Sequence, residues 1–148
     1  MVEPQEQFIA AHGLNFHLLD WGGDGEWIVC LHGLASQAHI WDLVAPRLTD
    51  SFRVIALDQR GHGLSGKPDS GYDFATVTAD LDAILTALHA SRDRAVLIGH
   101  SWGGNVAVQY AVDQPDRVSG LVLVDGGFLQ IGDRLDWPTV ERFLEPPD

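Results

Sequence analysis

The chain has 148 residues, of which 45% are hydrophobic and 20% charged, and a formal net charge of −12. This length and composition predict one folded domain with a sizeable core and argue against a disordered chain. The excess of acidic groups argues against nucleic acid and anionic membrane surfaces as partners, because both carry negative charge.

The N-terminal half alternates short apolar runs with turn signals. The runs FIAAHG and LNFHLLDWGG predict two strands joined at His12-Gly13, a hairpin turn candidate. The runs EWIVCLHG and FRVIALD predict strands that are buried on both faces. Between these two, residues 37–48 carry apolar side chains at helical spacing, which predicts a helix that Pro46 weakens or shifts.

The chain has one cysteine, Cys30, which lies within the third apolar run. A single cysteine excludes an internal disulfide, so we expect a buried core thiol and a reducing, cytoplasmic location. The first residues, MVEPQEQ, lack the pattern of a signal peptide, and no apolar run approaches the ~18 residues of a membrane span. We therefore expect no membrane partner.

The second half continues the alternation. An apolar stripe from Val77 to Leu88 predicts a helix, RAVLIGH a strand, the segment from Ser101 to about Val112 a helix, and GLVLVDGG a strand. This order predicts an α/β fold, a three-layer and mostly parallel sheet with helices on both faces. In such sheets ligands bind outside the carboxyl ends of the strands. We therefore expect the loops HGLAS, DQRGHGLS, GHSWGG and DGG to meet in one site.

The segment GHSWG, residues 99–103, matches the pattern G-x-S-x-G of a nucleophile elbow. A sharp turn from strand to helix exposes the serine hydroxyl, and side chains two residues before and after it would collide there. The N-terminus of the following helix favours developing negative charge. We predict that Ser101 is a nucleophile. The alternative is a serine that only caps the helix.

A serine that attacks a carbonyl group requires amide donors directed at the oxyanion. The residue after the nucleophile supplies one donor, here the Trp102 N–H, and the loop after the third strand supplies the other. The loop HGLAS occupies that place and makes the Leu34 N–H the second expected donor. The alternative is an ordinary strand-to-helix turn.

The order of the segments LHGLAS, ALDQRGHGLSGKP, LIGHSWGG and QPDRVSGLVLVDGG resembles the N-terminal half of α/β-hydrolase-fold proteins. The similar region runs from about Phe8 to Phe128, and it is most similar to serine-nucleophile esterase, lactonase, C–C hydrolase and haloperoxidase-like members. The resemblance implies that Asp58, Arg60 and His62 shape a loop beside the site.

The resemblance also implies a serine hydrolase that acts on a small ester, lactone or related acyl substrate through an acyl-enzyme at Ser101. Dehalogenases and epoxide hydrolases of this superfamily carry an aspartate at the elbow, so Ser101 argues against both. Serine acyl transfer requires no cofactor. One cysteine and the absence of a persuasive histidine pair predict no metal site.

In this family an acid and a histidine base follow the serine. All seven histidines of this chain precede Ser101, so the catalytic histidine is missing. Asp125 is a candidate acid, and the alternative is an aspartate that only shapes its loop. The alternative function is a catalytically inactive fragment or interaction module that needs another polypeptide to complete the fold.

We expect residues 1–127 to form a partial α/β-hydrolase core that ends after about the sixth strand, and residues 128–148 to begin a truncated cap or lid. Without a seventh strand, GLVLV becomes an unprotected apolar edge, which predicts self-association. A small-molecule acyl substrate is the other expected partner. Three tryptophans are candidates for a pocket wall or for core packing, namely Trp41, Trp102 and Trp137.

Overall fold

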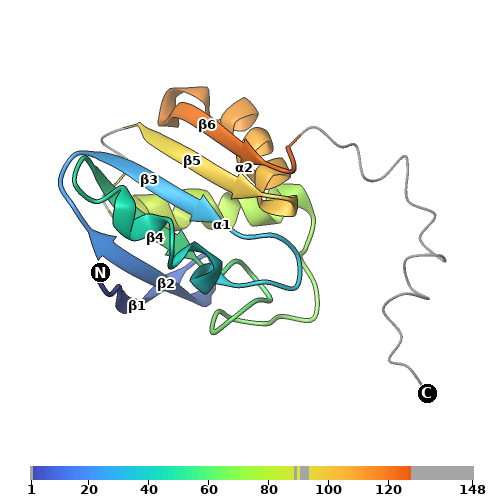
Figure 1. Cartoon of the computed structure of the whole chain (residues 1–148). Helices are drawn as coiled ribbons and strands as arrows, with labels where there is room; N and C mark the ends of the chain where they lie inside the picture. Colours follow the sequence, from blue (N-terminus) through green and yellow to red (C-terminus); the bar gives the residue numbers. More distant parts are fainter. Residues whose placement is uncertain (1, 89, 91–93, 128–148) are drawn as a thin grey trace, which may run out of the picture.

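The computed structural model describes residues 2–88, 90 and 94–127 (Figure 1). The six strands are β1 (Gln5–Ala11), β2 (Leu14–Gly22), β3 (Glu26–Leu31), β4 (Phe52–Leu57), β5 (Ala95–His100) and β6 (Val118–Val124). The α-helices are α1 (Phe74–Ala87) and α2 (Trp102–Asp113), and the short 3-10 helices are η1 (Ala38–Trp41), η2 (Ala45–Arg47) and η4 (Pro115–Arg117).

The strands form a single sheet in the order β1-β2-β4-β3-β5-β6. The four strands from β4 to β6 in this order run parallel, and β1 and β2 are antiparallel at one edge. The β1–β2 turn is the expected hairpin, because His12 and Gly13 both have positive φ, +47° and +76°, as a tight two-residue turn requires. The predicted α/β fold with a mostly parallel sheet is confirmed.

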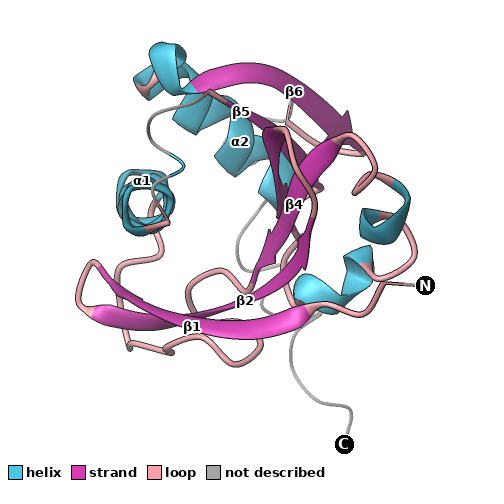
Figure 2. Cartoon of the chain, turned by 90° about the vertical axis from the view of Figure 1, so that its left-hand side faces the viewer, coloured by secondary structure: helices cyan, strands magenta, loops and turns pink. Residues whose placement is uncertain are grey.

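Two apolar cores cover the two faces of the sheet. Figure 2 shows α1 and α2 on one side of the curved sheet and the short helices η1 and η2 on the other. Strand alternation sends Leu97 to the α1–α2 core and its neighbour Ile98 to the opposite core. Cys30 also lies in the second core, fully buried, and burial raises the pKa of its thiol to about 12. The predicted buried thiol is confirmed.

The prediction of one helix over residues 37–48 is wrong. The segment forms η1 and η2 instead, with Pro46 in the first turn of η2. Proline has no N–H to donate, so one α-helix cannot run continuously through this position. The apolar spacing also misleads, because Leu43 is 73% exposed while Trp41 is buried.

The outer strand β6 carries apolar side chains that the described residues leave open. Leu121, Val122 and Val124 are 39%, 46% and 43% exposed. Within the described ranges, β6 pairs only with β5. Among the described strands, β6 is thus the outer strand at this end of the sheet (Figure 1).

The expected cap or lid segment, residues 128–148, lies outside the described residues, and so does Trp137. Among the residues that are described, no helix combines the length and the apolar character that a membrane crossing requires.

Candidate active site

Ser101 lies in a strained turn between β5 and α2. Its φ of +52° and ψ of −120° are unusual for a residue with a side chain. The Ser101 N–H donates to the Val124 carbonyl of β6 at 2.9 Å, which fixes the turn against the neighbouring strand. Its side chain makes no capping hydrogen bond to α2. The alternative of a serine that caps the helix through its hydroxyl is therefore not what the structure contains.

Close backbone approaches explain the glycines around this serine. A Cβ atom on Gly103 would meet the carbonyl oxygens of Leu31 and His32, and one on Gly99 would meet the backbone of Gly103 and Gly104. These contacts lie far inside van der Waals distance and involve backbone on both sides, so neither partner can move aside. The sequence reasoning that no side chain fits at positions 99 and 103 is confirmed.

The loop after β3 lies directly beside the serine. A Cβ atom built on Gly33 would stand 3.2 Å from the Ser101 Cβ. Leu34 follows in an exposed turn, and Trp102 begins α2 with its side chain buried. One expected oxyanion donor, Leu34, is thus in the loop beside Ser101, and the other, Trp102, directly follows it in the chain.

The loop after β4 forms the third side of this region and is organised around Asp58. Its Oδ1 accepts the Ala38 N–H at 2.7 Å, and its Oδ2 accepts the Leu64 N–H at 2.9 Å. The same Oδ2 lies 2.8 Å from His17 Nδ1 on β2. Burial opposes ionisation of Asp58, but the two amides and His17 outweigh it and lower the pKa of this carboxyl group. The loop-shaping role that the resemblance implied for Asp58 matches these contacts.

His32 and His62 are both committed to the backbone. His32 Nδ1 donates to the Gly33 carbonyl at 2.7 Å, and its Nε2 accepts the Gln59 N–H at 3.0 Å. Burial lowers the pKa of His32, so its ring stays neutral near pH 7. His62 Nδ1 faces the Arg60 carbonyl at 2.9 Å. These contacts make both rings part of the loop structure.

Two further described histidines are paired with carboxylates. His12 pairs with Asp80, and His39 pairs with Asp42. The His100 Nδ1 is buried without a hydrogen-bond partner. No hydrogen bond within the described part of the chain joins Ser101 Oγ to a histidine ring, and His89 lies outside that part. The structure thus brings no described histidine into the position of a base.

Asp125, the candidate acid, follows β6 in a left-handed conformation with φ of +51°. It is exposed, and it stands next to Val124, the residue that accepts the Ser101 N–H. The following Gly126 packs so closely on the Ser101 carbonyl that a Cβ atom there would collide with it. Asp125 is therefore beside the serine turn, but no described hydrogen bond connects its carboxylate to a histidine.

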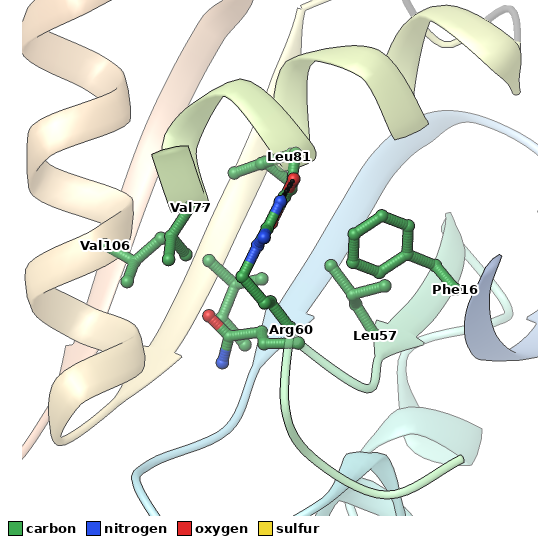
Figure 3. Close-up of a pocket in the computed structure, with 9 residues that line it drawn as sticks. Phe16, Leu57, Arg60, Val77, Leu81 and Val106 are labelled. Atoms are coloured by element: carbon green, nitrogen blue, oxygen red, sulfur yellow. Dashed lines mark hydrogen bonds and ion pairs between the residues drawn. The ribbon is translucent and has the colours of Figure 1, made fainter. Parts of the chain in front are cut away.

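A small enclosed cavity lies below the loops, between α1 and the sheet (Figure 3). Its volume is about 10 Å³, which accommodates about one water molecule. Arg60 crosses it toward α1 and makes a two-bonded ion pair with Asp80, at 2.7 and 2.8 Å. The cavity is too small for an acyl substrate. Trp41 and Trp102 are packed in the two cores rather than around a large pocket.

No group of three or more histidine, cysteine, aspartate or glutamate side chains in the described ranges is arranged to hold a metal ion. Sequence reasoning missed four side chains that organise the region: His17, Gln59, Ser65 and Asp80. The motif DQRGHGLS identified the loop, but the partners from β2 and α1 are distant in sequence. No sequence spacing connects His17 or Asp80 to this loop.

Fold and turn together define a class of protein: an α/β sheet with a strained serine at a strand-to-helix turn and a glycine loop beside it. Residues 26–146 match the family described as alpha/beta hydrolase fold, and the chain belongs to that family. The expected resemblance is confirmed at this level.

Two relatives of known designation and one solved structure illustrate the similarity. The chain is 38% identical to 2-(acetamidomethylene)succinate hydrolase of Mesorhizobium japonicum over 103 residues. This match covers 70% of this chain and 36% of that protein. It is 36% identical to the soluble epoxide hydrolase of Corynebacterium sp. over 129 residues. This match covers 86% of this chain and 44% of that protein.

The crystal structure of Cfl2 from Burkholderia cenocepacia is similar with a TM-score of 0.80 and 32% identity, over 96% of this chain and 51% of that chain. The present chain therefore spans between 36% and 51% of the length of these relatives. This share agrees with an α/β-hydrolase fold that is present in part.

Proposed function

We propose that this chain is the nucleophile-bearing part of a serine hydrolase that cleaves a small ester, lactone or related acyl substrate. The observation that supports this most is the conformation of Ser101, which is strained, makes no capping bond and faces the Gly33 loop. Strain of this kind costs roughly 1–3 kcal/mol and is retained mainly where function requires it. One relative is an epoxide hydrolase, but serine rather than aspartate at the elbow favours acyl transfer.

The proposed reaction has two steps. Ser101 Oγ loses its proton to a base and attacks the acyl carbon, while the Leu34 and Trp102 amides donate to the developing oxyanion. The leaving group departs with a proton, and water then attacks the acyl-enzyme and releases the acid and the free serine. Asp125 is the proposed acid that orients the base.

The base is proposed to come from outside these residues. All seven histidines precede Ser101 in the sequence, and no described histidine is hydrogen-bonded to the Ser101 hydroxyl. A second polypeptide, or further sequence like that of the longer relatives, would have to supply it. On this proposal the isolated chain turns over slowly.

The alternative is an interaction module that keeps the fold without catalysis. The exposed apolar side chains of β6 favour it, because an open strand edge recruits other strands. We propose self-association through this edge as the partner interaction of the isolated chain. We also propose a cytoplasmic location, for which the single buried cysteine is the support.

The test is p-nitrophenyl acetate hydrolysis with and without added imidazole, which replaces a missing histidine base. Wild type, Ser101→Ala and the control Ser119→Ala, which removes an exposed hydroxyl from β6, are compared. We expect imidazole to raise the rate of wild type and Ser119→Ala above that of Ser101→Ala. Equal rates for all three proteins in both conditions would falsify catalysis by this serine.

A further inference from the structure

The imidazole of His62 contacts both segments that carry the expected oxyanion donors. The Ala35 N–H donates to His62 Nε2 at 3.2 Å, so the ring reaches the turn that begins with Leu34. The same ring lies 5.9 Å from the Trp102 ring, between centroids, at the start of α2. His32 packs on it from another side, at 4.8 Å.

The partners of His62 determine which nitrogen carries its proton. The Arg60 carbonyl only accepts hydrogen bonds, so the Nδ1 that faces it must be protonated. The Ala35 amide only donates, so Nε2 must be bare. The ring is therefore a neutral imidazole with Nδ1–H, held by the backbone on both sides, and its lone pair points at the turn.

The turn that contains Leu34 and Ala35 has a strained backbone that this hydrogen bond stabilises. Ala35 has φ of +56°, in the left-handed region, where a residue with a side chain is strained. The hydrogen bond from the Ala35 N–H to His62 offsets part of this strain. It also restricts rotation of the turn that presents the Leu34 N–H. Three residues later, Ala38 donates to Asp58. The loop after β3 is thus fixed at two amides by side chains from the loop after β4.

We propose that His62 is a positioning residue that holds the Leu34 turn and Trp102 in register as the two sides of the oxyanion hole. This inference rests on the proposed function for its catalytic meaning. The positioning itself rests on the contacts of the ring with Ala35 and Trp102. His62 takes no proton from the substrate, because both of its nitrogens are engaged.

The first experiment measures positioning without catalysis, as amide hydrogen exchange by NMR on the 148-residue chain. We compare wild type, His62→Phe, which keeps a ring but loses the acceptor, and His62→Gln, whose side-chain carbonyl can replace Nε2. We expect the Ala35 amide to exchange about tenfold faster in His62→Phe and close to the wild-type rate in His62→Gln. The control His39→Phe removes a half-exposed imidazole that pairs with Asp42, and we expect no effect on Ala35.

The second experiment measures the Ser101-dependent hydrolysis rate of the same variants with imidazole present. We expect His62→Phe to lower kcat at least tenfold with KM nearly unchanged, because oxyanion donors act in the transition state. We expect His62→Gln to restore most of kcat. A merely structural residue would not give this pattern of loss and rescue.

The two experiments separate failure of this inference from failure of the proposed function. If wild type shows no serine-dependent rate, the proposed activity of the isolated chain fails, and the Ala35 exchange still decides the positioning. Unchanged Ala35 exchange in His62→Phe would overturn the inference, and so would a His62→Gln variant as defective as His62→Phe. Thermal unfolding of each variant confirms that the compared proteins are folded.

Discussion

The serine turn and strand β6 lie side by side and are joined by the hydrogen bond from Ser101 to Val124. They differ in how closely they are packed by the rest of the described chain. At the turn, backbone meets backbone so closely that hydrogen is the only tolerated substituent at Gly99 and Gly103. On β6, Leu121, Val122 and Val124 stand open, and a Cβ atom at Gly120 would make only ordinary van der Waals contacts. The contrast separates a turn that the described residues pack closely on both sides from a strand whose outer side chains they leave open.

The largest expected effect comes from Gly103→Ala. The new methyl group would meet the Leu31 and His32 carbonyl oxygens, and two rigid backbone segments would have to separate. We expect the free energy of unfolding to fall by more than about 4 kcal/mol, or folding to be lost. Urea unfolding followed by circular dichroism measures it.

Gly120→Ala on β6 is the matched control for that change. A methyl group there would make ordinary contacts with Val96, at 3.7 and 3.9 Å. We expect a stability change within about 0.5 kcal/mol, because nothing is displaced and the unfolded chain loses freedom. Equal losses at positions 103 and 120 would contradict the comparison.

The second effect concerns Asp58, which fixes the loops beside the turn. Asp58→Ala leaves the amides of Ala38 and Leu64 and the ring of His17 without their acceptor, and we expect a loss of about 3 kcal/mol. The control Asp42→Ala removes a half-exposed carboxylate that bonds to His39, and it should change stability by less than about 0.5 kcal/mol.

The contribution of Asp58 also predicts a pH dependence. Because its pKa is lower in the folded than in the unfolded protein, its stabilisation is present above the unfolded-state pKa and is lost as the pH falls through the folded value. The stability gap between wild type and Asp58→Ala should therefore narrow from neutral pH to about pH 3. A constant gap over this range would show that the carboxylate charge is not what stabilises the loops.

The third prediction is a gain in stability rather than a loss. Ser101→Gly replaces a residue held at positive φ with the residue that adopts this conformation without strain. We expect stability to rise by about 1 kcal/mol while the serine-dependent rate is lost. Ser119→Gly in β6 should instead lower stability by about 0.5–1 kcal/mol, because glycine weakens a strand. Thermal unfolding of both variants tests the difference in sign.

The smallest effect on stability is expected at the open strand. Val122 is 46% exposed, so Val122→Lys should change stability by less than about 0.5 kcal/mol. It should nevertheless reduce self-association, because a charged edge opposes strand pairing. Sedimentation velocity measures this, with Val112→Lys on the exposed side of α2 as control. A wild-type chain that stays monomeric at all concentrations would exclude the proposed association.

The sequence predicted the local elements and the serine turn because their signals are local. The strands follow from short apolar runs, and residues 99–103 combine a strand end, two glycines and a helix start within one motif. The helix expected over residues 37–48 was wrong because apolar spacing does not reveal how Pro46 divides the segment. His62 was assigned only to a loop, since its contact with Ala35 joins residues 27 positions apart.

The sequence by itself determined the family, the parallel α/β pattern and the serine at the elbow, because spacing and apolar runs encode them directly. Only the tertiary structure decided that Gly33 lies against Ser101, that Asp58 and His62 hold the loop after β3, and that none of the six described histidines is hydrogen-bonded to the serine hydroxyl. These facts depend on strand order and on side chains that meet from distant segments, and no local pattern fixes such distances.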